Sequence, residues 1–240
     1  MKLHLSSRGY DWTNERIIAS SVYIICTIIV LITLNVYESN FNFITLLWTI
    51  ISMILYFATM FLSPGYVTDY QKDFVQEYSL IPSHIKDKKQ YLNTLSKHAR
   101  FCVYCKLLKP LRSKHCYQCH HNYGKCIVKF DHHCPFMGND IGINNHRYFL
   151  LFLYSQTLLH CHVLLMSTHA YSLDVNHDAT KYNLGLQFGF FIFTFLSLII
   201  GILFGGSLAA YHSYLAITNQ TTYEQITQSK KRRKLKRGRR

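Results

Sequence analysis

Charged residues are scarce in this chain, and four long stretches lack them entirely. Asp, Glu, Lys and Arg make up 16% of the 240 residues, whereas a soluble domain usually has about a quarter. None of them occurs at residues 17–37, 39–68, 148–173 or 182–223. A helix that crosses a bilayer needs about 20 consecutive, predominantly apolar residues. The missing charge therefore excludes a large soluble core, and the 49% apolar content excludes disorder.

The four uncharged stretches predict four membrane-spanning helices. Their apolar cores lie at residues 17–34, 41–62, 148–166 and 184–210. The first is longer than the apolar part of a secretory signal, and no small-residue cleavage pattern follows it, so we interpret it as a span. The Ser63–Arg100 stretch, with its mixed charges, is expected to be a linker with local helix.

Lys and Arg are almost lacking from the two short connections between spans. The connection at residues 35–40 has none and that at 172–183 has only Lys181, whereas residues 63–147 carry 13 and the tail after Asn219 carries nine. Cytoplasmic segments carry the excess of Lys and Arg. The pattern predicts an integral multi-pass protein with both termini and the long middle segment in the cytosol. The like-charge run from Lys230 is expected to be disordered.

Cysteine is concentrated in the predicted cytosolic segment. Six of the eight cysteines fall between Cys102 and Cys134, and thiols in the cytosol stay reduced, which favours metal binding or catalysis over disulfides. Cys26 and Cys161 lie in predicted spans, where a cysteine is usually a small apolar residue.

Two cysteine pairs have the spacing of zinc ligands, Cys102-x2-Cys105 and Cys116-x2-Cys119. Two structural zinc sites need eight ligands. The segment offers eight without Cys134: Cys102, Cys105, Cys116, Cys119, Cys126, His115, His133 and Asp140. Spacing alone leaves the pairing open, and five other histidines are possible substitutes: His98, His120, His121, His132 and His146.

The run Asp131-His132-His133-Cys134 indicates a reaction rather than a purely structural role. A thiolate is a nucleophile, and a neighbouring imidazole activates it. A carboxylate next to that imidazole can fix its tautomer and stabilise its charged form. The alternative is that every cysteine, including Cys134, is structural and that the segment only binds partners.

With these motifs in place, the sequence resembles the DHHC family of membrane S-acyltransferases, the protein palmitoyltransferases. The DHHC-Pro marker stands at residues 131–135, and Gly142-x2-Asn145-x3-Phe149 follows it. A TTxE motif stands at Thr221–Glu224, and Ser63-Pro64-Gly65 occupies the place of the family's Asp-Pro-Gly. The chain is most similar to the short members without ankyrin repeats.

The resemblance implies an all-α membrane protein of four spans with a small zinc-stabilised cytosolic cysteine-rich domain between spans 2 and 3. It implies that Cys134 accepts a fatty acyl chain from acyl-CoA, expected to be palmitoyl-CoA, with His132 and Asp131 assisting, and passes it to a substrate cysteine. It also implies two interleaved structural zinc ions. One would be held by Cys102, Cys105, His115 and Cys126, and the other by Cys116, Cys119, His133 and Asp140.

The implied partners are the bilayer, palmitoyl-CoA and proteins with membrane-proximal cytosolic cysteines, and no nucleic acid. The expected location is the Golgi or endoplasmic reticulum membrane. The expected organisation is a cytosolic N-terminus (1–16), two spans (17–62), a linker (63–100), the cysteine-rich domain (101–147), two further spans (148–217), and the TTxE motif with the basic tail (218–240).

The sequence departs from the family pattern at several positions. Asp140 replaces a cysteine ligand, Phe136 stands where a tryptophan is usual, and residues 120–125 form a longer insertion between cysteines. These departures keep open a catalytically weak or inactive zinc-stabilised scaffold of the same fold. A metal or proton transporter is a second alternative, because three histidines lie in or near span 3: His160, His162 and His169.

Overall fold

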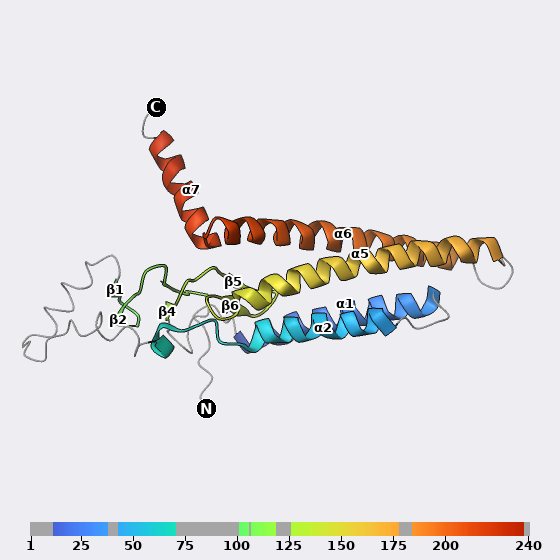
Figure 1. The fold of residues 1–240 in the computed structure, drawn as a ribbon, viewed down its shortest axis with the longest axis horizontal. Helices are drawn as coiled ribbons and strands as arrows, with labels where there is room; N and C mark the ends of the chain where they lie inside the picture. The colour runs from blue at the N-terminus through green and yellow to red at the C-terminus, as the bar shows by residue number, and fades with distance from the viewer. Residues whose placement is uncertain are drawn as a thin grey trace, which may run out of the picture. The chain divides into compact units, whose positions relative to one another are not determined.

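The computed structural model describes residues 12–37, 43–70, 101–105, 107–118, 126–177 and 184–237 (Figure 1). The chain forms two compact units, each assembled from separate segments. One contains residues 1–17, 59–147 and 218–240, and we call it the cysteine-rich unit. The other contains residues 18–58 and 148–217, and we call it the helical unit.

Helices α1 (Trp12–Tyr37), α2 (Phe43–Phe61), α5 (His146–His177) and α6 (Leu184–Ile217) supply the helical unit. Three of them, among the residues described, are long and apolar enough to cross a membrane, at Phe43–Phe61, His146–Thr168 and Phe191–Ile217. These three overlap the predicted spans 2, 3 and 4, at residues 41–62, 148–166 and 184–210. The predicted span at residues 17–34 falls within α1, a helix of 26 residues that is not among the three.

Aromatic and polar side chains tie these helices together. The Tyr23 ring of α1 stacks on Tyr56 of α2, with ring centroids 4.0 Å apart, and its hydroxyl donates to Gln156 of α5 at 3.3 Å. Trp48 of α2 donates its indole N–H to Ser155 of α5 at 3.2 Å. Polar groups inside a bilayer need internal partners, and these bonds supply them.

The histidines of the third predicted span pack against neighbouring helices. The His162 ring lies 2.9 Å from the Thr45 hydroxyl. Gly201 of α6 faces His160, since a β-carbon added there would lie 3.1 Å from its ring. The side chain of His169 lies outside the described residues. His160 and His162 therefore have the packing environment of bundle residues, which does not favour the transporter alternative.

The cysteine-rich unit corrects one prediction, because the chain is mostly helical but not all-α. It holds three short antiparallel hairpins: β1 (Phe101–Cys102) with β2 (Leu107–Leu108), β3 (Lys114–His115) with β4 (Cys126–Ile127), and β5 (His132–Cys134) with β6 (Asn139–Ile141). The ligands of this unit lie in or beside tight turns, and these turns are joined here by extended segments rather than helices.

The segment after α2 packs on these hairpins through backbone contacts. It contains the 3₁₀ helix η1 (Val67–Tyr70), and Val128 donates its N–H to the Gly65 carbonyl at 2.9 Å. Ile127 is fully buried beside Cys116 and Phe130. The predicted linker at residues 63–100 stays a prediction, since residues 71–100 lie outside the described part of the chain.

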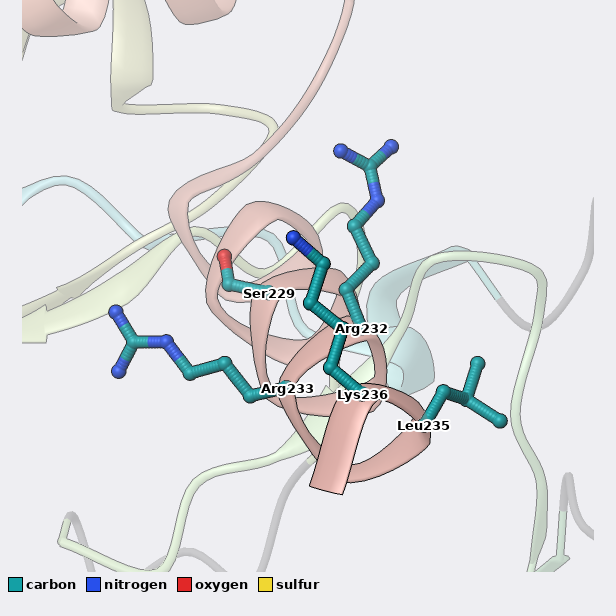
Figure 2. A pocket seen from close by; sticks show the side chains of 5 residues that line it. All are labelled: Ser229, Arg232, Arg233, Leu235 and Lys236. Atoms are coloured by element: carbon teal, nitrogen blue, oxygen red, sulfur yellow. The ribbon is translucent and has the colours of Figure 1, made fainter. Parts of the chain in front are cut away.

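The basic tail is helical rather than disordered as far as Arg237. Helix α7 (Thr222–Arg237) begins at a capping box, in which Thr221 accepts from the Glu224 N–H at 3.3 Å and Glu224 accepts from the Thr221 N–H at 2.9 Å. This reciprocal pair starts the helix despite the like charges that follow. Arg232, Arg233 and Lys236 of α7 extend outward around an open hollow, together with Ser229 and Leu235 (Figure 2).

Candidate functional site

The β5–β6 hairpin carries most of the chemistry-bearing residues. Its register pairs His132 with Ile141, His133 with Asp140 and Cys134 with Asn139. Side chains alternate between the two faces of a strand, so His132 and Cys134 share one face and His133 points to the other. The hairpin turn needs Gly138, which has a φ of +52°. The register therefore gives the two adjacent histidines different surroundings.

Asp131 is buried and held by three donors. Its Oδ2 lies 2.6 Å from His132 Nδ1, and it accepts from the Thr222 hydroxyl at 2.8 Å and the Thr222 N–H at 2.9 Å. Burial by itself would raise the pKa of Asp131, but the hydrogen bonds from His132 and Thr222 lower it to about 2. Asp131 is therefore a carboxylate at neutral pH, and it fixes the orientation of the His132 ring.

His132 contacts both Asp131 and Cys134. Burial lowers the pKa of His132, whereas its hydrogen bonds with Asp131 and Cys134 raise it to about 9. Cys134 itself is only 5% exposed. An imidazole oriented by a carboxylate and placed next to a cysteine sulfur, whose proton it can take, is the arrangement used in cysteine nucleophilic catalysis. The structure therefore brings the three predicted catalytic residues together.

An ion pair that sequence reasoning missed connects the cysteine-rich segment to the start of α7. Arg112 donates to both carboxylate oxygens of Glu224, at 2.7 and 2.8 Å, and its other Nη donates to Asn219. Lys114 places its ammonium 3.8 Å from the centre of the Tyr223 ring. The T-x-x-E spacing was a sequence signal for the capping box, but nothing local to Arg112 identified it as the partner of Glu224.

The first predicted metal group is complete in the structure. The ligand atoms of Cys102, Cys105, His115 and Cys126 all lie within 4.8 Å of one another. The sulfurs of Cys126 and Cys105 are 3.7 Å apart, close to the separation of about 3.8 Å expected for two thiolates on one tetrahedral zinc ion. Cys105 Sγ lies 3.2 Å from His115 Nδ1. This donor set fits a closed structural zinc site.

Two thiols of this group, Cys105 and Cys126, share a hydrogen bond. The hydrogen bond from Cys126 lowers the pKa of Cys105 to about 5, although burial opposes the shift. The same bond raises the pKa of Cys126, and burial adds to that rise. Two thiols that share a proton in this way present one thiolate at neutral pH, and metal binding would displace the remaining proton.

The second group contains three of its four predicted ligands. Cys116, His133 and Asp140 have ligand atoms within 4.8 Å of one another, and His133 Nδ1 lies 2.9 Å from Asp140 Oδ1. Cys119 lies outside the described residues. Burial lowers the pKa of His133, and its bonds with Asp140 and Cys116 raise it to about 10. The groups that attract this proton also attract a metal cation, which competes for the same nitrogen.

The substitute histidines do not take these places within the described residues. His132 faces Asp131 and Cys134, and His146 begins α5 and belongs to neither group. His98, His120 and His121 lie outside the described residues. Asp140 thus lies among the possible ligand atoms of the second group, together with Cys116 and His133.

The fold and site together define a class of protein, a membrane protein with several apolar helices and a Cys/His-rich unit that can bind metal and carries an Asp-His-His-Cys hairpin. Comparison with known families identifies the class further. The family described as DHHC palmitoyltransferase matches residues 95–229, more than half of the chain. The chain belongs to this family.

Individual relatives agree with this assignment. Protein S-acyltransferase 8 of Arabidopsis thaliana is 33% identical over 199 residues, which are 76% of this chain and 47% of the relative. Palmitoyltransferase ZDHHC2 of Homo sapiens is 35% identical over 142 residues, 58% of this chain and 36% of the relative. The chain thus spans about half or less of the length of these curated relatives.

Proposed function

We propose that this chain is a protein S-acyltransferase that moves a fatty acyl group from acyl-CoA to cysteines of other proteins through an acyl-Cys134 thioester. The observation that carries the proposal is the contact of the partly exposed His132 with two buried residues, Asp131 and Cys134. Family membership and the names of the relatives, which include palmitoyltransferases and protein S-acyltransferases, support it.

The chemistry consists of two thioester exchanges. In the first, the Cys134 sulfur attacks the carbonyl carbon of acyl-CoA, the carbon–sulfur bond to CoA breaks, and the CoA sulfur takes the proton that Cys134 gave to His132. In the second, a substrate thiol gives its proton to His132 and attacks the acyl carbonyl. Cys134 then leaves as a thiolate and regains that proton. Asp131 keeps the His132 ring aligned for both transfers.

Two structural zinc ions form part of the proposal. Cys102, Cys105, His115 and Cys126 would hold one, and Cys116, Cys119, His133 and Asp140 the other. Zinc would fold the hairpins around the site, since such small segments bury little apolar surface. On this view Asp140→Ala lowers the zinc content by one ion per chain, while Asp140→Cys keeps both and resists chelators better, because a thiolate is a strong zinc ligand.

The membrane setting completes the proposal. The stretch at residues 17–34 of α1 carries no charged residue and would form span 1. With the three other helices this gives four spans and places both termini in the cytosol. The acyl donor would be palmitoyl-CoA, and the acceptors proteins with cytosolic cysteines near a Golgi or endoplasmic reticulum membrane. The exposed basic residues of α7 favour contact with anionic lipid headgroups.

The test uses the purified full chain with labelled palmitoyl-CoA, followed by hydroxylamine, which cleaves thioesters. We expect a hydroxylamine-labile label that Cys134→Ser abolishes without changing the zinc content. Cys26→Ser is the matched control, because Cys26 lies on the exposed side of α1, and it should label normally. A label that persists in Cys134→Ser would refute the assignment of the nucleophile.

One observation favours a second candidate, a zinc-stabilised membrane scaffold without catalysis. Asp140 offers the metal an oxygen, a harder donor than a cysteine sulfur. Weaker metal binding would leave the β5–β6 hairpin, which carries Cys134, less firmly held. The same labelling experiment separates the two functions. A chain that holds two zinc ions and inserts into membranes but never acquires a thioester label is a scaffold.

A further inference from the structure

A carboxylate from the N-terminal turn of α1 reaches the second metal group. Glu15 is 8% exposed, and its Oε2 lies 3.2 Å from His133 Nε2, the ring nitrogen opposite the one that faces Asp140. The His133 side chain is itself only 4% exposed. Two buried carboxylates thus bracket one imidazole from opposite sides, and 118 residues of sequence separate Glu15 from His133.

The next residue of α1 holds the far end of the same hairpin. Arg16 donates its Nε–H to the Gly138 carbonyl at 3.1 Å. The contact is close, since a β-carbon added at Gly138 would lie 2.6 Å from Arg16 Cγ and 2.9 Å from its Cα. Glu15 and Arg16 therefore contact β5 and the β5–β6 turn together, so the start of α1 holds the hairpin that carries Cys134 at two points.

We propose that Glu15 is the outer carboxylate of the second metal centre, accepting the Nε2–H of His133 while Nδ1 of that ring binds the metal. The inference rests on the proposed zinc site of Cys116, Cys119, His133 and Asp140. It extends that site to a residue that precedes the first predicted span and has no counterpart among the motifs of the cysteine-rich segment.

The chemistry of metal-bound histidine explains why a carboxylate belongs there. A metal-ligating imidazole almost always donates its second N–H to a carboxylate, carbonyl or water, which fixes the tautomer and strengthens the ligand. An acidic residue in the first turn of a helix is also stabilised by the helix dipole. That effect alone needs no burial and no partner, whereas Glu15 is turned inward onto His133.

Glu15 is a positioning group and not a fifth ligand. Asp140 lies at Nδ1 and Glu15 at Nε2, so one ion bound to this ring cannot be shared by both carboxylates. The ligand atoms of Cys116, His133 and Asp140 cluster together without Glu15. Because His133 directly precedes Cys134, a carboxylate that fixes its ring also fixes the backbone that presents the proposed nucleophile.

The test measures zinc release from the full chain in detergent. Unmutated protein, Glu15→Gln and Glu15→Ala are loaded with zinc, their ions are counted, and release to a chelator is followed with time. We expect two ions in each loaded protein. In Glu15→Ala one ion should leave faster and bind more weakly by about 10–100-fold, as is typical when an outer partner is removed, and the other should be unaffected. Glu15→Gln, which keeps an acceptor without the charge, should be intermediate.

Asn14→Ala is the matched control, because Asn14 lies in the same helical turn and is exposed; its two ions should leave at the unmutated rates. If both ions leave Glu15→Ala at the unmutated rates, the proposal is overturned. It is also overturned if Glu15→Ala cannot be loaded with a second ion, because loss of the ion is expected when a direct ligand is removed. An unmutated chain with one ion also overturns it. Acyl labelling is measured separately, so an unlabelled chain with the expected release pattern refutes the proposed function and leaves this inference standing.

Discussion

At the scale of single residues, the neighbours His132 and His133 have different partners because a strand places successive side chains on opposite faces. His132 contacts Asp131 and Cys134, while His133 contacts Asp140 and Glu15. Two identical side chains, adjacent in the sequence, therefore stand in an environment suited to proton transfer and in one suited to metal binding. Substitution of His132 and substitution of His133 should therefore have different effects.

We expect His132→Ala to slow acyl labelling of Cys134 by about 10²–10⁴-fold, the usual contribution of a positioned general acid–base group, with two zinc ions retained. His133→Ala should lose one zinc ion and destabilise the hairpin, because metal binding contributes folding free energy. Zinc content by mass spectrometry and initial labelling rates provide the two measurements. If both variants lost zinc, or both kept it and were equally slow, the division of roles would be wrong.

The Glu224 carboxylate supports a prediction about pH. Burial raises the pKa of Glu224, but the Arg112 guanidinium beside it outweighs burial and holds that pKa below its usual range. A carboxylate with a lowered folded pKa adds stability above its unfolded pKa of about 4.3, and that stability is lost as the pH falls through the folded value.

Glu224→Gln should therefore unfold more easily at pH 7, by about 1–2 kcal/mol for a partly exposed bidentate pair. The difference from the unmutated protein should shrink below about pH 4.3. Thermal unfolding followed by circular dichroism between pH 3 and 7 measures it. Lys231→Gln, an exposed change on the same helix, should make little difference at any pH. A constant gap for Glu224→Gln across this range would exclude the ion pair as its cause.

At the scale of elements, the β5–β6 hairpin is anchored to the end of α2 by one amide. The Asn139 side chain donates to the carbonyls of Thr59, Met60 and Leu62 at 3.0–3.1 Å. The last carbonyls of a helix have no partner within the helix, so a buried donor is needed there. Asn139 is 2% exposed, so its amide supplies these donors from within the protein.

We expect Asn139→Ala to destabilise the cysteine-rich unit by about 2–4 kcal/mol, since it leaves buried carbonyls without a donor and opens a small cavity. Faster zinc release and a lower unfolding temperature would report the loss, while membrane insertion should be unchanged. Val103→Ala, a truncation at an exposed position, should have little effect on either. Unchanged stability in Asn139→Ala would mean that the hairpin does not depend on this anchor.

At the scale of the whole molecule, the uneven distribution of Lys and Arg predicts how the chain lies across the membrane. A glycosylation acceptor inserted at residues 35–40 or at 178–183 should be modified in the endoplasmic reticulum, because both connections are predicted to be lumenal. The same acceptor inserted at 71–100 should stay unmodified. Glycosylation of the acceptor at 71–100 would show that the predicted orientation is wrong. Absence of glycosylation at 35–40 alone would argue against a span at 17–34.

The apolar helices and the ligand inventory were predictable from sequence because both depend on local composition. Twenty uncharged residues leave a chain few options other than a buried or spanning helix. Two cysteines with two residues between them can bind one metal ion from a single tight turn. Two local predictions were nevertheless wrong or incomplete. The basic tail is helical because the capping box at Thr221 and Glu224 starts it, and the ligand-bearing turns need short strands that an all-α assignment omits.

The sequence by itself thus determined the three apolar membrane-length helices, the supply of metal ligands and the family to which the chain belongs. The tertiary structure alone decided which distant residues meet: Arg112 with Glu224, and Glu15 with His133. Spacing along a chain restricts neighbours within a few residues. Contacts across about 110 residues arise only when buried polar groups must find partners in the folded chain, and no periodicity encodes that choice.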